Sequence, residues 1–409
     1  MVEMKSGYKM TEVGVIPEDW EVKNVSESCL IKARIGWQGL KKSEYMSSGD
    51  YLLITGTDFD NGQVNWKSCA YVSKARYEQD SNIKIRPQDI LISKDGTIGK
   101  VAYLGMIPKA GTLNSGIFVI RANDRKIDQV FLSKIFMSFY FEEFLNRLVA
   151  GSTINHLYQK DFVKFCFPLP NSEEQTAIAT ALSDVDSLIS ALTKKIEKKK
   201  AIKQGIMQQL LTGKKRLPGY EKNREPVQTE WGAIPKDWKT LSIGKCCSIK
   251  ARIGWQGLKK SEYLSSGEYV LVTGTDFLNG RIDWKSCVYV SKKRYEQDAN
   301  IQIVKHDILI TKDGTIGKVA FLDDVPCLGT LNSGIFVVRS HSEELDQCYL
   351  SKIFESFIFD AFLESLVAGS TINHLYQKDF VHFNFPVPPT MSEQTAIANI
   401  LSDCDSEIA

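Results

Sequence analysis

Long apolar runs, cysteines at metal-binding spacing and a strong net charge are all missing from this sequence of 409 residues. No run approaches the about 18 apolar residues that a membrane-spanning helix needs, and the first ten residues lack the apolar core of a secretion signal. The nine cysteines contain no CxxC pair, which favours free thiols in a reducing compartment. We therefore expect a cytoplasmic protein without a membrane partner.

Catalytic and cofactor-binding motifs are missing as well. The stretch GTIGK at 96–100 resembles part of a phosphate-binding loop, but the glycines are too close and Val101 replaces the magnesium-binding Ser or Thr. Neither the glycine fingerprint of a dinucleotide site nor the Asn/Asp-Pro-Pro-aromatic tetrapeptide of an amino-methyltransferase occurs. None of the five histidines has a metal or triad partner at useful spacing. We expect no enzyme, no cofactor and no metal site.

What the sequence does contain is a repeat of domain size. The segment IKARIGWQGLKKSEY occupies 31–45 and again 249–263, at an offset of 218 residues. The copies align without a gap from 31 to 170, and a single inserted residue after Pro388 changes the offset to 219. A repeat of this length is a domain and excludes a short-period solenoid. Because the formal net charge is only +2, a nucleic-acid partner would have to be bound by local basic patches.

Each copy begins with a mixed segment. In the first copy, short apolar runs at 51–55, 89–93 and 116–120 are separated by turn residues and predict strands. The segment 129–148 has apolar residues at spacings of three and four, which predicts a helix.

The mixed segment is followed by a helical one. A capping pattern at 171–175 precedes apolar residues at heptad spacing, namely Ile178, Leu182, Val185, Ile189, Leu192 and Ile196. This predicts a spacer helix that ends near Gly213 and is about 60 Å long at 1.5 Å per residue; one helix of a compact bundle is the alternative. The heptad spacing starts again at Ile397, and the sequence ends at Ala409. We therefore expect residues 190–213 to lack an intramolecular partner and to favour self-association.

The predicted fold class is α+β. Two mixed α/β domains are joined by long antiparallel coiled-coil helices, with a pseudo-two-fold internal repeat. The predicted boundaries are 1–170 for the first mixed domain with its N-terminal arm, 171–215 for the spacer helix, 216–236 for a linker, 237–388 for the second mixed domain and 389–409 for a truncated second spacer helix.

The chain resembles the DNA-specificity subunits of type I restriction–modification systems. The resemblance covers essentially the whole chain and is most specific in DILISKDGTIGKVA at 89–102, GSTINHLYQKDFVKFCFPLP at 151–170 and AIKQGIMQQLLTGKKRL at 201–217. It implies that the mixed domains are target-recognition domains and that the helices bind two modification subunits. Methyl transfer from S-adenosylmethionine would belong to those subunits, and restriction subunits would complete the nuclease.

The resemblance implies a non-catalytic DNA-recognition subunit for double-stranded DNA. Two like recognition domains on antiparallel helices would read the same half-site in inverted orientation, so we expect an interrupted palindromic target. Two alternatives stay open, a self-contained DNA-modifying enzyme and a coiled-coil adaptor without a DNA role.

Three polar loops in each domain are the candidate DNA contacts. Lys and Arg can bind phosphates, and Arg, Gln and Asn can pair with base edges. Each loop also has a plain structural interpretation: a glycine-rich surface loop, a hairpin turn and a helix-capping turn. The candidates in the first domain are Lys32, Arg34, Gln38, Lys41, Lys42, Lys94, Asp95, Thr97, Ser152, Thr153, Asn155, His156, Tyr158, Gln159 and Lys160. Their counterparts in the second are Lys250, Arg252, Gln256, Lys259, Lys260, Lys312, Asp313, Thr315, Ser370, Thr371, Asn373, His374, Tyr376, Gln377 and Lys378.

Overall fold

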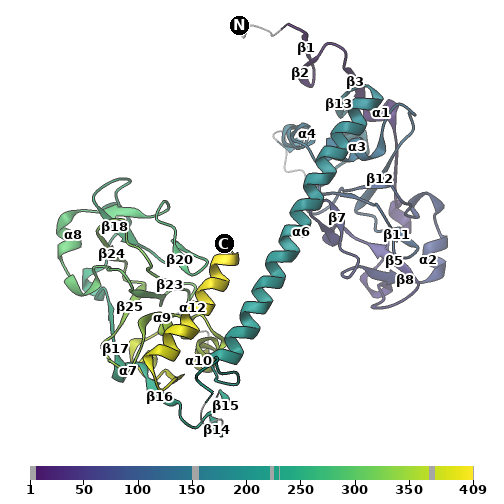
Figure 1. Ribbon diagram of the computed structural model, residues 1–409. Coiled ribbons are helices and arrows are strands. Elements are labelled where there is room, and N and C mark those ends of the chain that lie inside the picture. Colours follow the sequence, from purple (N-terminus) through teal and green to yellow (C-terminus); the bar gives the residue numbers. More distant parts are fainter. Residues whose placement is uncertain (1–5, 150–155, 222–224, 230, 368–373, 409) are drawn as a thin grey trace. The chain divides into compact units, whose positions relative to one another are not determined.

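Two units with the same order of strands and helices make up the chain. The structure is a computed structural model that describes residues 6–149, 156–221, 225–229, 231–367 and 374–408. It divides into Met1–Ala191 and Leu192–Ala409, each a mixture of helix and sheet (Figure 1). This confirms the mixed character predicted from the sequence.

The first unit is built around a four-stranded antiparallel sheet. Its strand order is β10-β9-β12-β4, for β10 (Val101–Tyr103), β9 (Ile90–Ser93), β12 (Ile117–Ala122) and β4 (Cys29–Ala33). A second sheet has the order β11-β5-β8, for β11 (Gly111–Leu113), β5 (Tyr51–Ile54) and β8 (Ala70–Val72), with β11 and β5 parallel. Two-stranded pairs join β1 (Tyr8–Thr11) to β2 (Gly14–Pro17), β3 (Glu21–Asn24) to β13 (Cys166–Leu169) and β6 (Phe59–Asp60) to β7 (Gln63–Val64). The three predicted apolar runs are therefore strands.

The four-stranded sheet is buried on both faces. Ile90 and Ile92 belong to a cluster with the helices of the unit, while Leu91 between them belongs to a cluster with the three-stranded sheet. Successive strand residues point to opposite faces, and both faces of β9 are apolar. The sheet therefore holds its edges and connecting turns in fixed positions.

The helix predicted at 129–148 is two helices. α3 (Gln129–Phe136) ends at Met137, and α4 (Phe139–Val149) begins after Ser138. The break lets Phe136 and Phe141 pack edge to face, with ring centroids 5.3 Å apart, in one core. The prediction of a single helix was wrong because apolar spacing does not reveal a change of helix direction. The short helices of the unit are α1 (Val25–Ser28), α2 (Lys74–Glu78) and α5 (Gln159–Phe162).

The second unit repeats this arrangement. Its sheets have the orders β17-β25-β22-β23 and β21-β18-β24, for β17 (Cys247–Ala251), β25 (Ile335–Ser340), β22 (Ile308–Thr311), β23 (Val319–Phe321), β21 (Val288–Val290), β18 (Tyr269–Val272) and β24 (Gly329–Leu331). The two-stranded pairs are β14 (Pro226–Thr229) with β15 (Gly232–Pro235), β16 (Lys239–Ser242) with β26 (Asn384–Val387), and β19 (Phe277–Leu278) with β20 (Arg281–Ile282). Its helices are α7 (Ile243–Cys246), α8 (Lys292–Glu296), α9 (Gln347–Phe354), α10 (Phe357–Val367) and α11 (Gln377–Phe380).

A single long helix, α6 (Ser172–Leu210), begins in the first unit and ends in the second (Figure 1). The side chain of Asn171 accepts a hydrogen bond from the Glu174 amide at 3.0 Å and caps the helix start. Gly213 has a positive φ of 66°, and a Cβ there would lie 2.5 Å from Pro235. The helix thus begins beside Asn171 and ends three residues before Gly213.

The last helix, α12 (Met391–Ile408), runs antiparallel to the end of α6 within the second unit. Lys199 pairs with Glu407 and Lys203 pairs with Asp405, so rising numbers on one helix meet falling numbers on the other. Met207 and Leu210 share a core with Ile397 and Leu401. The expectation that all of 190–213 lacks an intramolecular partner is therefore wrong for its second half.

Candidate nucleic-acid interface

The first predicted loop, residues 32–42, has an arginine that faces the interior. Arg34 is 2% exposed, and its Nε donates to the Leu113 carbonyl at 2.9 Å while Nη2 donates to Thr112 Oγ1 at 3.0 Å. Arg252 makes the same bonds to Leu331 and Thr330. Burial, together with the nearby Arg76 charge, lowers the pKa of Arg34. Arg34 and Arg252 hold β11 and β24 in place and have no surface for DNA, so this part of the predicted contact set is wrong.

The glutamines of this loop are also buried. Gln38 is 6% exposed and Gln256 is 7% exposed. Their Oε1 atoms accept no hydrogen bond from the described part of the chain. A buried side chain cannot reach a base edge in a groove, so these two predicted base readers are wrong in this structure. The sequence pattern could not reveal this, because glutamine between glycines is typical of exposed loops.

The lysines of the loop are on the surface. Lys32 lies on β4, Lys41 caps the start of a short 3-10 helix and Lys42 is its first residue. All three are exposed, as are Lys250, Lys259 and Lys260. Glu44 fixes this helix, because it accepts from the Lys41 amide at 2.8 Å and from Arg76 Nε at 2.7 Å. These bonds, the backbone bond first, lower the pKa of Glu44. The loop thus presents cations from a fixed backbone.

The second predicted loop is the turn between β9 and β10. Gly96 and Gly99 have positive φ of 71° and 82°, and Lys100 N donates to Ser93 Oγ at 2.9 Å. The turn is closed by Ser93 Oγ, which donates to the Thr97 carbonyl at 2.5 Å. Asp95 and Thr97 are exposed at its tip, and their counterparts Asp313 and Thr315 are exposed as well.

Lys94 differs from its neighbours in the turn. It is half-buried, with Nζ 5.2 Å from the centre of the Phe118 ring, and Lys312 lies 5.1 Å from that of Phe336. Such a contact between a cation and a ring stabilises the turn against the sheet.

The third loop contacts the second through two neighbouring pairs of residues. The Leu157 amide donates to the Lys94 carbonyl at 2.8 Å, and His156 Nδ1 is hydrogen-bonded to the Asp95 carboxylate. His374 and Asp313 form the same pair in the second unit. Two loops that lie 61 residues apart in sequence therefore form one surface.

Beyond His156 the third loop carries an aromatic and a cation. Tyr158 is 54% exposed, its ring centroid is 4.6 Å from that of His156, and Lys160 Nζ lies 5.5 Å from the Tyr158 ring. Tyr376 and Lys378 repeat this contact at 5.5 Å. Gln159 and Gln377 are both exposed at the start of their helices, and Gln377 also donates to the Ile249 carbonyl at 3.2 Å. The predicted contacts Ser152, Thr153, Asn155, Ser370, Thr371 and Asn373 lie outside the described residues.

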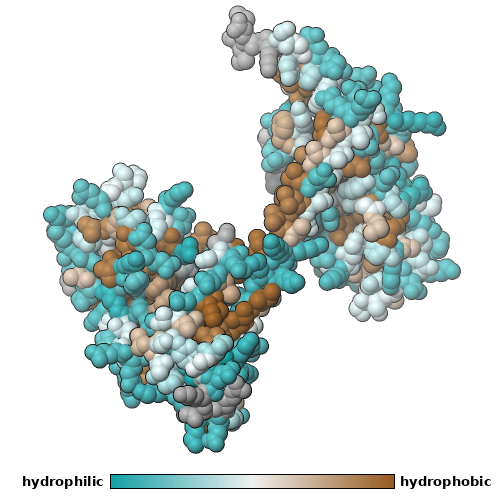
Figure 2. Space-filling view, in the orientation of Figure 1, coloured by the Kyte–Doolittle hydropathy of each residue, from teal (hydrophilic) through white to brown (hydrophobic). Residues whose placement is uncertain are grey.

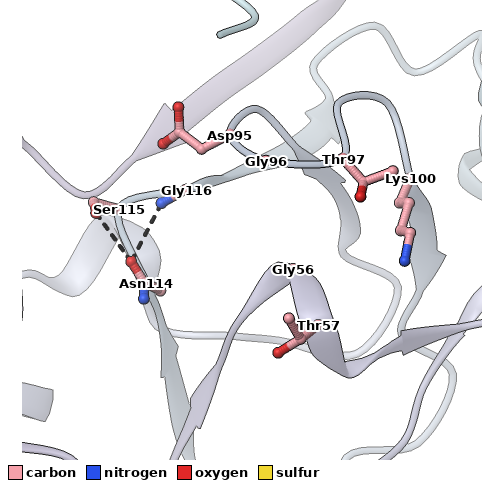
Figure 3. A pocket seen from close by; sticks show the side chains of 9 residues that line it. All are labelled: Gly56, Thr57, Asp95, Gly96, Thr97, Lys100, Asn114, Ser115 and Gly116. Atoms are coloured by element: carbon pink, nitrogen blue, oxygen red, sulfur yellow. Dashed lines mark hydrogen bonds between the residues drawn. The ribbon is translucent and has the colours of Figure 1, made fainter. Parts of the chain in front are cut away.

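Two segments that the sequence analysis missed complete this surface. A pocket of about 390 Å³ lies between the turn at 95–100 and these two segments, as Figure 3 shows. The two segments contribute the lining residues Gly56, Thr57, Asn114, Ser115 and Gly116. Identity between the copies was the available signal, since TGTD at 55–58 and GTLNSGIFV at 111–119 return unchanged at 273–276 and 329–337. That signal is weak, because a recent duplication preserves core and surface alike.

An asparagine in the lining of the pocket is bonded to three other residues. Asn114 Nδ2 donates to the Tyr45 hydroxyl, and its Oδ1 accepts from Ser115 Oγ at 2.9 Å and from the Gly116 amide at 3.3 Å. Tyr45 follows the 3-10 helix at the end of the first loop, so Asn114 joins that segment to the pocket. Asp95 and Lys100 lie at opposite edges of the pocket (Figure 3).

Other kinds of site find no support in the described residues. Within these ranges no group of three or more His, Cys, Asp or Glu side chains could hold a metal ion. Over the same residues no helix is both long and apolar enough to cross a membrane. The polar surface of loops and pocket is thus the candidate site.

Comparison with known proteins identifies the family. The profile described as "Type I restriction modification DNA specificity domain" matches residues 17–204 and again 235–409. The chain belongs to this family. The two matched stretches each contain one copy of the loops and turns described above, so the specificity domain of the family is present twice.

Relatives of known kind agree with this assignment. Two type I restriction enzyme specificity subunits of Methanocaldococcus jannaschii, MjaX and MjaVIII, are 28% and 27% identical to the chain. These alignments cover 99% and 96% of the chain and 91% and 88% of the relatives. The crystal structure of a type I S subunit from M. genitalium has the same fold, with a TM-score of 0.61 at 16% identity over 95% of this chain and 90% of that one.

Proposed function

We propose that this specificity subunit recognises DNA for a type I restriction–modification complex and contributes no catalytic group itself. The observation that carries the proposal is a loop surface present twice, once in each specificity domain. Exposed lysines at 41 and 42, Lys100 at the pocket and Lys160 beside Tyr158 supply cations for phosphates, and the pocket supplies polar groups for bases.

Basic residues of the first loop should bind phosphates. Lys41 and Lys259 are exposed next to helices fixed by Glu44 and Glu262. Replacing both lysines with Ala should weaken binding to all duplexes alike and lower the salt slope by roughly one per lost contact. Titration of labelled duplexes at several salt concentrations measures this. A matched control is Lys67→Ala with Lys285→Ala, exposed lysines outside the three loops; an equal effect of the control would contradict the role.

The target of the proposed subunit is an interrupted palindrome. The same loop residues occur in both domains, so both should read the same bases, and a near two-fold relation between the domains would invert one half-site. The alternative is a direct repeat or two unrelated half-sites. Mapping adenine methylation genome-wide, in cells with and without the gene, distinguishes these outcomes: the predicted motif is one short sequence, a gap and its reverse complement.

The helices are the proposed binding surface for two modification subunits, with S-adenosylmethionine bound by those subunits and with restriction subunits as further partners. Exposed apolar side chains on α6 support this, with exposed fractions of 45% for Leu182, 48% for Leu192 and 49% for Ile202; Figure 2 shows apolar residues on this surface. Self-association through the same residues is the competing prediction. Co-purification of the subunits, with sedimentation of the chain alone as the comparison, separates the two.

A further inference from the structure

The loop surface contains an acidic residue where phosphate binding alone would favour basic ones. Asp95 lines the pocket, and its side chain is 45% exposed. We propose that Asp95 and its counterpart Asp313 are base-reading residues, each of which accepts a hydrogen bond from the exocyclic amino group of a cytosine or an adenine in one half-site. This inference rests on the proposed function and names the chemical group that it reads.

Among the described residues, the carboxylate is bonded through one oxygen and free at the other. Asp95 Oδ1 is hydrogen-bonded to His156 Nδ1, and the two residues also form a β-bridge. Its Oδ2 accepts no hydrogen bond from the described residues. A side chain that is held through one oxygen presents the other in a defined direction, which is what readout of a single hydrogen-bond donor requires.

The chemistry of the pocket selects an amino group. A carboxylate accepts hydrogen bonds but repels a phosphate, and in the major groove the only base donors are N4 of cytosine and N6 of adenine. Lys100 at the opposite edge of the pocket can bind a phosphate (Figure 3). The DNA backbone would then contact the Lys100 edge of the pocket, and the base would contact the Asp95 edge. Asn114, the other group that could read a base, is bonded to Tyr45, Ser115 and Gly116.

The second unit repeats the hydrogen bonds of this arrangement. His374 is bonded to Asp313, and Asn332 Nδ2 donates to the Tyr263 hydroxyl at 2.6 Å. A carboxylate that served only to tether the loop to His156 or His374 would also leave its second oxygen unbonded. The free oxygen is therefore the feature that the experiment must test.

Gly116 offers an independent way to block that oxygen. A methyl group added there would lie 3.4 Å from Asp95 Oδ2, and one added at Gly334 would lie 3.5 Å from Asp313 Oδ2. These are ordinary contact distances, so Gly116→Ala would cover the free oxygen and leave the pair with His156 in place. Asp95→Asn is complementary, because asparagine can still accept from His156 but replaces the negative acceptor.

The experiment selects duplexes from a randomised library with the full chain in complex with its modification subunits. The parent should select a motif with C or A at one defined position in each half-site. Asp95→Asn should lower the preference at that position in one half-site by roughly tenfold, and Asp313→Asn should do so in the other half-site. Gly116→Ala should affect the same position as Asp95→Asn. Asp50→Asn, an exposed aspartate outside the pocket, is the control and should leave the motif unchanged.

Three results would overturn the inference. Preferences that are the same in the parent, Asp95→Asn and Gly116→Ala would show that Asp95 reads no base. An equal loss at every position would show that it only positions the loop. A parent that selects no motif at all would overturn the proposed function itself, and this inference with it.

Discussion

The start of α6 and the start of α12 have nearly the same sequence, but apolar residues at matching positions are buried more deeply in α12. Leu401 of α12 is 0% exposed, whereas its counterpart Leu182 is 45% exposed. Asp405 pairs with Lys203 and Lys352, whereas its counterpart Asp186 pairs with Lys134. The difference arises because the second part of α6, which packs on α12 in the second unit, occurs once in the chain.

The tryptophan near the base of each helix shows the same effect. Trp20 Nε1 donates to Glu174 at 3.0 Å in the first unit. In the second unit the counterpart Glu393 accepts from Arg216 Nε at 2.6 Å, and Trp238 Nε1 donates to no group in the described residues. Arg216, which belongs to the segment that occurs once, therefore takes the place that Trp20 has in the first unit as partner of the glutamate. Equivalent positions of the two units thus differ in their hydrogen bonds.

The largest effect is expected from Arg216→Ala. Its side chain is 5% exposed and pairs with Glu393, which is 1% exposed, so the change leaves a buried carboxylate without this cation. We expect a loss of about 3–5 kcal/mol in the stability of the second unit. Hydrogen exchange of α12 measures this, with the first unit as internal reference and the exposed neighbour Lys214→Ala as control.

The pH dependence sharpens this test. Burial raises the pKa of Glu393, and Arg216 opposes that rise. In the Arg216→Ala variant the carboxyl should become neutral more readily, so the loss of stability should shrink as the pH falls. A loss that is independent of pH would mean that the packing of Arg216, and not the uncompensated charge, is responsible.

The next largest effect separates Leu401 from Leu182. Leu401→Ala leaves a cavity in the core of the second unit and should cost about 2–5 kcal/mol, whereas Leu182→Ala at a half-exposed position should change stability by about 0.5 kcal/mol or less. Local hydrogen exchange in each unit measures both. Equal losses would show that Leu182 is covered in solution, as self-association would require.

The third prediction, smaller in effect than the first two, concerns Asp405→Asn, with the counterpart Asp186→Asn as the comparison. Burial tends to raise the pKa of Asp405, but hydrogen bonds from Lys203 and Lys352 outweigh it and lower the pKa. A carboxyl with a lowered pKa stabilises the fold above the ordinary aspartate pKa of about 3.9, and that stabilisation is lost as the pH falls further. We expect a cost of about 1 kcal/mol near neutral pH.

Acid titration of the unfolding of the second unit measures this effect. The parent should lose stability in the acid range more steeply than Asp405→Asn does. A variant that matches the parent at every pH would show that the pair with Lys203 contributes nothing.

The smallest effect is expected where the two units agree. Gln38→Met and Gln256→Met each remove a buried oxygen that has no partner among the described residues, so stability should change by about 0.5 kcal/mol or less in either unit. The selected DNA motif should stay the same, because neither side chain reaches the surface. A changed motif would show that Gln38 and Gln256 contact DNA after all.

Sequence reasoning succeeded where the signal was local or repeated. The strands at 51–55, 89–93 and 116–120 follow from short apolar runs, and the ends of α6 follow from Asn171 and Gly213, whose backbone geometry depends on a few neighbouring residues. It failed for Arg34 and Gln38, because their residue types are typical of surfaces. Burial of an arginine requires acceptors, here Leu113 and Thr112, that lie far away in sequence.

The sequence by itself determined the two-copy organisation, the family resemblance and the heptad spacing of the spacer helix, since each is written in the order of residues. Only the tertiary structure decided which polar residues share a surface. Asp95 meets His156 because β9 and the third loop are adjacent in the fold, and Thr57 joins them because β5 lies in the neighbouring sheet. It also decided that Leu401 is buried and Leu182 exposed, because burial depends on which other segment packs against a helix.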